Sequence, residues 1–327
     1  MSASGGSVSS GGSTTPRTPL DGDALRVWKA IEAGDAATVA SVRDLPALLE
    51  LQLGPDGIPL LVKALQEYSS ARLAESNMAV FRTLLDASSR TAVNVPDSKT
   101  GWSPLMWALS SAFAFTDMLD LLLLRDTDLD VRRALAVFCG SYHRADYKKY
   151  FEWLIGHGAD VQEGYSQGNT PLHKACQNHS IGGLLVRALI KKSADVNAVN
   201  DRGETALFHA VYRSRPELVR VLVDAGADVT VRDAAGKTPR DYAPPADPVH
   251  DMLRDMEERV REISAWLDEL GMARYLPTFL RHQVYVDVVG LLDEERLVQM
   301  GISTVGDRLR LLNGNKLISA GANQRRD

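Results

Sequence analysis

The stretch GNTPLHKA at residues 168–175 returns twice along the chain, as GETALFHA at 203–210 and as GKTPRDYA at 236–243. The two intervals are 35 and 33 residues long. A second phrase, GADV or SADV, keeps these same intervals and begins at residues 158, 193 and 226. Two phrases that recur in phase indicate a stack of repeated units, in which each unit packs on its neighbours.

The chemistry of each phrase predicts a short helix. Thr170 suits the N-cap position, and Pro171 follows at the first helical position, where the missing N–H of proline does no harm. Leu172 and Ala175 then share one face, and the small alanine lets a neighbouring helix approach closely. Gly226 suits the end of a second helix. Each unit is therefore predicted to be a pair of helices.

These residues resemble the ankyrin repeat, a unit of about 33 residues whose signature includes T-P-L-H-x-A. The resemblance implies an all-α solenoid of helix pairs with β-hairpin tips, which binds a partner protein across the tips and the first helices on its concave side. Candidate partner contacts are an aromatic anchor, Trp102, and the tip residues Asn200, Asp201, Arg202, Arg232 and Asp233. The alternative is that the tip charges only keep the surface soluble and that Trp107, a second aromatic candidate, belongs to the core.

The repeat pattern extends upstream in a weaker form. GWSPLMWA at 101–108 precedes the first quoted phrase by 67 residues. That distance is about two periods, so one diverged unit is placed at 131–162. Residues 24–35 are similar to a half-repeat, and 60–85 is predicted to hold another unit with an insertion. We expect about six or seven units, which are degenerate before residue 98.

The chain has two cysteines, Cys139 and Cys176, which the diverged alignment places at equivalent positions of adjacent first helices. Packed helices lie about 8–10 Å apart, whereas a disulfide needs α-carbons within about 7 Å. We therefore predict two buried free thiols. Few cysteines and no zinc-binding spacing favour a reducing compartment, so we expect a cytoplasmic location, with the nucleus as the alternative.

A second domain follows the repeats. Three prolines between Pro244 and Pro248 end the array, and 249–270 is predicted to be a helix whose first part caps the solenoid. From Ile263 the sequence resembles a sterile alpha motif, or SAM domain, which implies a bundle of five helices. The matching positions include Trp266, Leu270-Gly271-Met272, Tyr275, Phe279, Leu297, Met300-Gly301-Ile302 and Gly306-Asp307-Arg308. The predicted core of the bundle consists of Trp266, Leu270, Tyr275, Phe279, Leu291, Leu297 and Leu312.

In the SAM family, a surface of the middle helices docks onto the start of the last helix of a neighbouring domain, which gives pairs or polymers. Such a contact joins two different surfaces and therefore does not close on itself. The resemblance places the last-helix surface at Gly306, Arg308, Arg310 and Lys316. It places the middle surface at Asp287, Asp293, Glu294 and Glu295.

Two alternatives stay open for these charges. They are solvated helix faces with no partner, or the basic residues bind RNA, as some SAM domains do with the last helix. RNA binding would use Arg308, Arg310 and Lys316, but residues 260–327 hold nine basic and nine acidic side chains. Such a balance gives no strong field for binding phosphate, so protein partners are favoured.

Neither catalysis nor a cofactor finds support in the sequence. No Ser/His/Asp set, phosphate-binding loop or zinc-binding HExxH helix is present, so we expect a non-enzymatic adaptor without a cofactor or metal. The resemblance implies that His173 and His209 bond the backbone of a neighbouring turn. The net charge of −5 comes from mixed acids and bases, and the leucine-rich run 119–124 is short. A membrane span needs about 20 apolar residues, so neither nucleic acid nor a membrane is an expected partner.

The predicted organisation has five parts. They are a disordered Ser/Gly-rich tail at 1–20, ankyrin repeats at 21–245, a capping helix at 246–262, a SAM domain at 263–320 and a tail at 321–327. The 101–108 phrase and the diverged unit after it are also similar to germ-cell adaptors that combine ankyrin repeats, a SAM domain and a basic leucine zipper.

Overall fold

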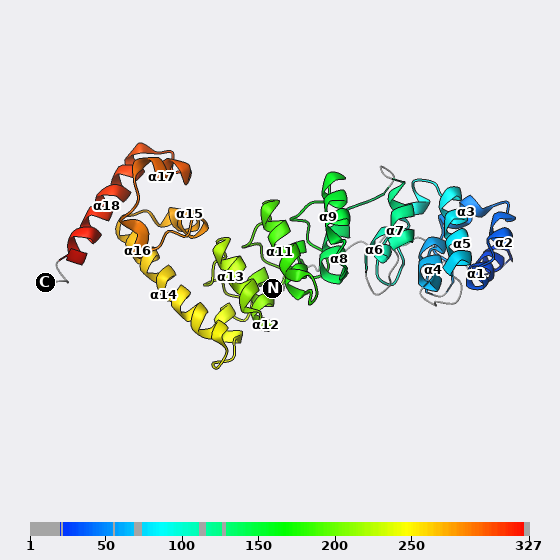
Figure 1. Ribbon diagram of the computed structural model, residues 1–327, viewed down its shortest axis with the longest axis horizontal. Coiled ribbons are helices and arrows are strands. Elements are labelled where there is room, and N and C mark those ends of the chain that lie inside the picture. The colour runs from blue at the N-terminus through cyan, green and yellow to red at the C-terminus, as the bar shows by residue number, and fades with distance from the viewer. Residues whose placement is uncertain are drawn as a thin grey trace, which may run out of the picture. The chain divides into compact units, whose positions relative to one another are not determined.

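The structure of the protein is a computed structural model that describes residues 20, 22–54, 56–68, 74–110, 116–125 and 129–323. The predicted N-terminal tail lies outside the described residues apart from Leu20, as do the last four positions of the predicted C-terminal tail. The chain divides into two compact units, Met1–Ala134 and Leu135–Asp327. The described residues form helices and no strand, so the predicted all-α class is confirmed (Figure 1). None of these helices is long and apolar enough to cross a bilayer.

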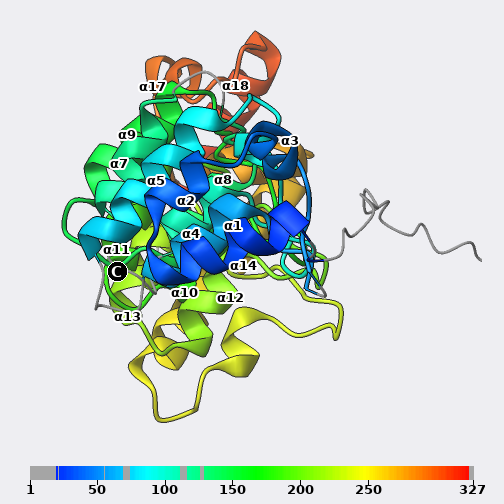
Figure 2. The same cartoon turned by 90° about the vertical axis from the view of Figure 1, so that its right-hand side faces the viewer.

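The first unit is built from paired helices. Their bounds are α1 Gly22–Ala33, α2 Ala36–Ala40, α3 Leu45–Leu49, α4 Leu60–Tyr68, α5 Ala74–Ala87, the 3₁₀ helix η1 Ala92–Asn94, α6 Pro104–Leu109 and α7 Thr116–Leu123. Helices α1 and α4 lie side by side (Figure 2), while α4 packs on α5 and α6 packs on α7. Ile31, Leu60 and Phe81 are almost completely buried. The weak upstream pattern thus still specifies packed helices.

Three helix pairs lie at the positions of the predicted repeats. Their bounds are α8 Ala134–Ser141 with α9 Tyr147–Gly156, α10 Pro171–Gln177 with α11 Gly182–Lys191, and α12 Ala206–Tyr212 with α13 Pro216–Asp224. Thr170 begins α10 in a capping box, in which its backbone N–H donates to His173 Nδ1 at 3.2 Å. Helices α10 and α12 lie side by side (Figure 2), so first helices stack on each other.

The last repeat is shorter than the others. The phrase at 236–243 forms only a 3₁₀ helix, η3 Pro239–Tyr242, which begins with a capping box between Thr238 and Asp241. The next helix, α14 Pro248–Glu269, packs on η3 and α13 and buries Val249 and Leu253 completely. The first half of α14 therefore covers the end of the stack.

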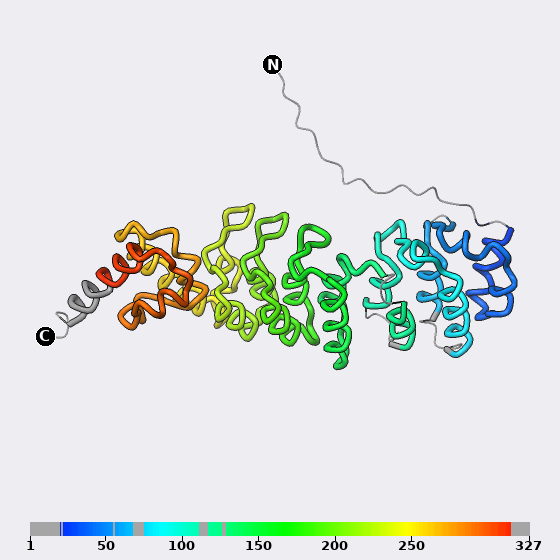
Figure 3. The backbone as a smooth tube through the Cα atoms, turned by 90° about the horizontal axis from the view of Figure 1, so that it is seen from above, coloured from blue at the N-terminus to red at the C-terminus, as the bar shows by residue number. Residues whose placement is uncertain are grey.

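Tight turns link the repeats, and Figure 3 shows that they project on one side of the second unit. In each turn a backbone N–H donates to the carbonyl oxygen four residues later, from Tyr165 at 2.9 Å, Asn200 at 2.9 Å and Asp233 at 3.0 Å. Neighbouring turns are also joined, since the N–H of Asp201 donates to the carbonyl oxygen of Gln167 at 3.1 Å. The predicted β-hairpin tips are therefore turns that are too short to form strands.

The C-terminal bundle uses the second half of α14 and four further α-helices. Their bounds, with one 3₁₀ helix, are η4 Ala273–Tyr275, α15 Leu276–Arg281, α16 Val286–Val289, α17 Glu294–Gln299 and α18 Val305–Asn323. Ile263, Leu267, Phe279 and Leu297 are completely buried. Because α14 is uninterrupted (Figure 1), the capping helix and the first helix of the bundle are one element.

The prediction that Leu291 belongs to the core of the bundle is wrong. Leu291 is 66% exposed, because it follows the end of α16 and the preceding Val289 fills the interior instead. Pro277 falls in the first turn of α15, where its missing N–H is not needed. A β-carbon on Gly314 would lie 2.6 Å from Leu270 Cδ1, so close packing explains this glycine inside α18. Three predicted core residues are only half-buried: Leu270, Tyr275 and Leu312.

Gly182 and Gly183, at the start of α11, offer a matched pair of substitutions. A β-carbon at Gly182 would lie 2.5 Å from the backbone oxygen of Ala175, whereas one at Gly183 would meet only Leu218 at 3.6 Å. We expect Gly182→Ala to lower the free energy of unfolding by about 1–3 kcal/mol, because the backbone must move. Gly183→Ala should raise it by up to about 0.5 kcal/mol. Denaturant unfolding measures both, and equal losses would contradict the close approach of α10 and α11.

Candidate protein-binding surfaces

Two of the predicted tip residues belong to the interior of their turns. The Asn200 side chain is 5% exposed, and its Oδ1 accepts the backbone N–H groups two and four residues later at 2.9 and 3.1 Å. Asp233 Oδ1 accepts the equivalent groups of the next turn at 2.9 and 3.0 Å. The hydroxyl of Tyr242 and the backbone N–H of Lys237 hold the pKa of Asp233 below its usual value. These two side chains therefore shape the turns, and Asn200 is removed from the candidate surface.

The other tip residues face outward. Asp201, Arg202 and Arg232 are exposed. Arg202 Nη2 lies 2.9 Å from Glu204 Oε2, and Arg232 Nη1 donates to the carbonyl oxygen of Gly236 at 2.7 Å. The Arg202 side chain is 56% exposed although its partner Glu204 is buried, so both guanidinium groups still face solvent and are able to meet a partner.

The two candidate tryptophans pack on each other in the first unit. The ring centroids of Trp102 and Trp107 lie 5.5 Å apart at 68°, which is an edge-to-face contact. Trp107 Nε1 donates to Asp97 Oδ2 at 3.1 Å. Both tryptophans are half-buried, so the two rings support each other and Trp102 keeps part of its surface for a partner.

The sequence did not reveal an aromatic cluster beside the tips. The Tyr212 ring, 39% exposed, lies edge-on to Tyr242 at 5.0 Å between centroids. Its hydroxyl donates to Glu204 Oε1 at 2.7 Å. Burial alone would raise the pKa of Glu204, but hydrogen bonds from Asn200 and Tyr212 reverse this and lower it. The sequence signal for this cluster was a tyrosine at the end of two successive first helices, Tyr212 in α12 and Tyr242 in η3.

Both histidines are structural. His209, which was expected to bond the backbone of a neighbouring turn, contacts a side chain instead, whereas His173 bonds that backbone as expected. His173 Nε2 lies 2.9 Å from the carbonyl oxygen of Glu204, in the neighbouring turn. The two rings meet edge-to-face at 5.6 Å. His209 Nδ1 lies 3.2 Å from Gln177 Nε2, while its buried Nε2 lies 3.8 Å from Glu204 Oε2 and has no hydrogen-bond partner among the described residues. Burial, reinforced by the nearby His173, lowers the pKa of His209 to about 4, so its ring is neutral at pH 7.

In the C-terminal bundle, the charges of the two predicted surfaces are paired within the molecule. Arg308 Nη2 lies 3.2 Å from Glu294 Oε1, although the prediction put these residues on opposite sides of an intermolecular contact. Arg308 is 8% exposed, and its Nη1 also donates to the carbonyl oxygens of Ile302 at 3.0 Å and Ser303 at 2.6 Å. Its side chain holds α17 to α18, so the prediction of a free surface arginine is wrong.

The remaining acids of the middle region have local partners as well. Asp287 Oδ2 lies 2.6 Å from Arg259 Nη2, and Asp293 caps α17 by accepting the backbone N–H of Arg296 at 2.8 Å. Glu295 accepts a hydrogen bond from Gln299. All three carboxylates remain exposed, so they can still form the rim of a contact.

Comparison with known families identifies both parts of the second unit. Residues 141–233 match the family "Ankyrin repeats (3 copies)", and residues 257–315 match the family "SAM domain (Sterile alpha motif)". The chain contains ankyrin repeats and a SAM domain. The first match spans the repeats from the end of α8 onward, and the second begins inside α14, ahead of the predicted start at Ile263. Both modules are themselves non-catalytic.

The relatives are longer proteins. Stress-activated protein kinase alpha of Dictyostelium discoideum is 32% identical over 187 residues, which is 56% of this chain and 28% of that protein. A second Dictyostelium protein, described as a "Probable serine/threonine-protein kinase", is 26% identical over 293 residues, 85% of this chain and 34% of its own length. This chain therefore spans about a third of these relatives or less.

A solved structure shows the same fold. The crystal structure of the human ASB11 ankyrin repeat domain superimposes with a TM-score of 0.51 at 20% identity, covering 70% of this chain and 96% of that one. At this identity the likeness concerns the fold alone. The similarity to germ-cell adaptors stays a prediction.

Exposed apolar side chains mark both predicted surfaces of the SAM domain. Leu291, beside the middle acids, is 66% exposed, and Val305 and Leu309, in the first two turns of α18, are 56% and 52% exposed. Gly306 and Arg310 are exposed on the same part of α18. The side chain of Lys316 lies outside the described residues. Neither Leu291 nor Leu309 was predicted as a contact.

The burial of His209 predicts a pH-dependent stability. Its pKa is about 4 in the folded protein and about 6.5 in an unfolded chain, so the unfolded state binds more protons between these values. The contribution of the neutral His209 to the free energy of unfolding is therefore fully present above about pH 6.5. It falls by about 2–3 kcal/mol as the pH drops toward 4. His209→Gln should flatten this decline in thermal unfolding, whereas His143→Gln, at an exposed histidine, should not. An unchanged decline in His209→Gln would contradict the assignment.

Replacing Arg308 should destabilise the SAM domain. In Arg308→Gln the carbonyl oxygens of the buried Ile302 and of Ser303 lose their donor, which lowers the free energy of unfolding by about 1–3 kcal/mol. Arg310→Gln, at an exposed position of the same helix, should change it by less than about 0.5 kcal/mol. Denaturant unfolding measures both variants. Equal stability of the two would show that Arg308 has no internal role.

Proposed function

We propose that the chain is a non-enzymatic adaptor whose ankyrin repeats bind a partner protein and whose SAM domain links copies of the chain. The presence of two protein-interaction modules supports this proposal. The observation that carries it is the exposure of Leu291, Val305 and Leu309 on two different surfaces of one small domain. Large apolar side chains grouped on a surface usually mark a site of association.

The SAM contact is apolar at its centre. Because Glu294 and Arg308 already neutralise each other, they supply little attraction for a second molecule. Leu291 of one domain instead packs against Val305 and Leu309 of the next, while Asp293, Glu295 and Arg310 surround the contact. Apolar anchors carry most of the energy of such an interface, and the rim charges orient it. Two unlike surfaces join head to tail, so the contact extends into a chain of domains.

The ankyrin contact uses the exposed row beside the tips. Arg202 and Arg232 lie on successive turns, and the half-exposed Tyr212 lies next to Glu204, which pairs with Arg202. Tyrosine and arginine are enriched among the residues that dominate binding energy, because they combine a large contact area with hydrogen bonds. Trp102 provides a comparable aromatic surface in the first unit.

RNA binding has less support. RNA binding would use Arg308 as a free cation, but Arg308 is 8% exposed. Its guanidinium group already contacts two carbonyl oxygens and Glu294 of the same domain. Of the three basic residues predicted to bind RNA, Arg310 is then the exposed one whose side chain the structure describes. Protein association therefore remains the function that the side chains favour.

The cysteines support a reducing compartment. Cys139 and Cys176 are buried free thiols, as predicted. Burial raises the pKa of the Cys176 thiol to about 12, so it stays protonated and unreactive. The proposed location is the cytoplasm, with the nucleus as the alternative.

Sedimentation velocity of the full chain tests the SAM contact. We expect wild-type protein to form oligomers whose size grows with concentration. Leu291→Glu and Leu309→Glu should each sediment as monomers, because a buried carboxylate opposes an apolar contact. A mixture of the two variants should form a 1:1 dimer, since each variant retains the surface that the other has lost.

Leu184→Glu is the matched control. Leu184 is an exposed leucine on the ankyrin helix α11, 51% exposed, and its replacement should leave the oligomers unchanged. Three results would overturn the proposed contact: a monomeric wild type at every concentration, a mixture that stays monomeric, or equal dissociation by Leu184→Glu.

A further inference from the structure

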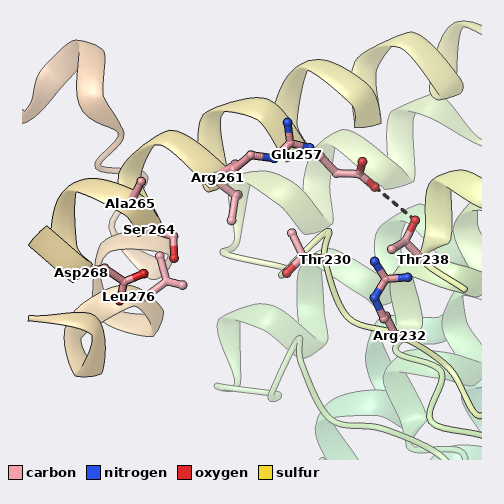
Figure 4. A pocket seen from close by; sticks show the side chains of 10 residues that line it. Thr230, Arg232, Thr238, Glu257, Arg261, Ser264, Ala265, Asp268 and Leu276 are labelled. Carbon is pink, nitrogen blue, oxygen red and sulfur yellow. Dashed lines mark hydrogen bonds between the residues drawn. The ribbon is translucent and has the colours of Figure 1, made fainter. Parts of the chain in front are cut away.

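A pocket of about 410 Å³ lies between the last ankyrin turn and helix α14 (Figure 4). Thr230 and Arg232 line one side, and α14 forms the other from Glu257 to Asp268. Its volume falls within the range of about 300–1,000 Å³ that is typical of ligand sites. No part of the proposed SAM contact lines it.

The walls of the pocket are held together by a buried carboxylate. Glu257, 7% exposed, accepts a hydrogen bond from Thr238 Oγ1 at 3.1 Å and lies 3.1 Å from Arg240 Nε. This bond ties α14 to the start of η3 and is drawn in Figure 4. Because Arg240 neutralises Glu257, this carboxylate adds little net charge to the pocket.

A second contact joins the ankyrin stack to the SAM domain outside the pocket. Gln283 of the SAM domain donates to the backbone oxygen of Asp224, the last residue of α13. Gly226 lies so close to Arg281 that a β-carbon there would be 2.8 Å from the arginine Cα. The ankyrin stack and the SAM domain are therefore in direct contact next to α14, in addition to sharing that helix.

Arg232 lies at one end of the pocket, and Asp268 lies at the other (Figure 4). Arg232 and Arg261 are exposed, and within the described part of the chain neither forms an ion pair. Leu276 supplies apolar surface beside Asp268 at the end away from Arg232 (Figure 4), and the largely buried Val260 also belongs to the lining. A ligand that matches the pocket carries a carboxylate at one end and an apolar group next to a basic group at the other.

We propose that this pocket binds an extended acidic peptide segment of a partner protein, with a carboxylate at Arg232 and Arg261 and an apolar side chain against Val260 and Leu276. Guanidinium groups bind carboxylates through two parallel hydrogen bonds, which gives both affinity and orientation. A free anion would leave the apolar wall uncovered. Asp268 repels a second acid and so sets the direction of the peptide. The site rests on the proposed protein-binding function but is separate from the SAM contact.

Fluorescence anisotropy with a defined peptide tests the pocket. The probe is fluorescein-labelled Gly-Glu-Glu-Leu-Ser-Lys-amide, titrated with the full chain, and the comparison peptide has lysine in place of both glutamates. We expect saturable binding of the acidic peptide, weakened about tenfold by Arg261→Glu, which replaces an attraction with a repulsion. The same variant should bind the lysine peptide better than the wild type does.

Arg220→Glu is the matched control, since Arg220 is an exposed arginine of α13 that does not line the pocket. It should bind the acidic peptide as the wild type does, and so should the monomeric Leu309→Glu. A failure of SAM association would therefore leave peptide binding intact. No saturable binding by wild-type protein, or an equal loss in Arg220→Glu, would overturn the proposal.

Discussion

Polar groups of each ankyrin repeat in the second unit are satisfied by the next repeat, and the rest of that unit depends on this constraint. Asn178 Nδ2 donates to the carbonyl oxygen of Tyr142 in the preceding repeat at 2.7 Å, and its own carbonyl oxygen accepts from Arg215 of the following one at 2.7 Å. A single repeat would leave such groups buried without partners, which is costly. The stack therefore fixes the spacing of its turns, and with it the spacing of Arg202 and Arg232.

The parts of the fold that could be predicted are those that neighbouring residues encode. Thr170 and Pro171 start a helix whatever lies elsewhere, because capping and the fixed φ of proline act within one turn. Gly226 ends a helix for an equally local reason, since its φ of 89° suits glycine. Repetition of these signals then predicts stacking, because like units bury like faces. The last repeat differs from the repeat pattern because its first helix is the four-residue η3 and because α14 takes the place of its second helix.

The candidate site was predicted less well, because charge on a helix does not reveal its partner. Glu294 and Arg308 have the complementary charges expected of an intermolecular contact, yet the turn between α17 and α18 brings them together within one domain. Asn200 is a residue type that is common at exposed tips, but its side-chain oxygen accepts two backbone N–H groups within the turn. Leu291 seemed a core residue by type. In each case the decisive contact depends on how the chain folds back, which a local pattern does not contain.

The unbroken helix α14 gives the proposed association a geometric consequence. With a flexible linker, the effective concentration of a second binding site falls as the linker lengthens. Here α14 belongs to both the ankyrin stack and the SAM domain, and Gln283 also donates a hydrogen bond to the backbone oxygen of Asp224. Linked SAM domains would therefore present their ankyrin surfaces at fixed intervals. A partner with several matching sites would gain avidity without any new contact, whereas a kink in α14 would remove that gain and leave both surfaces intact.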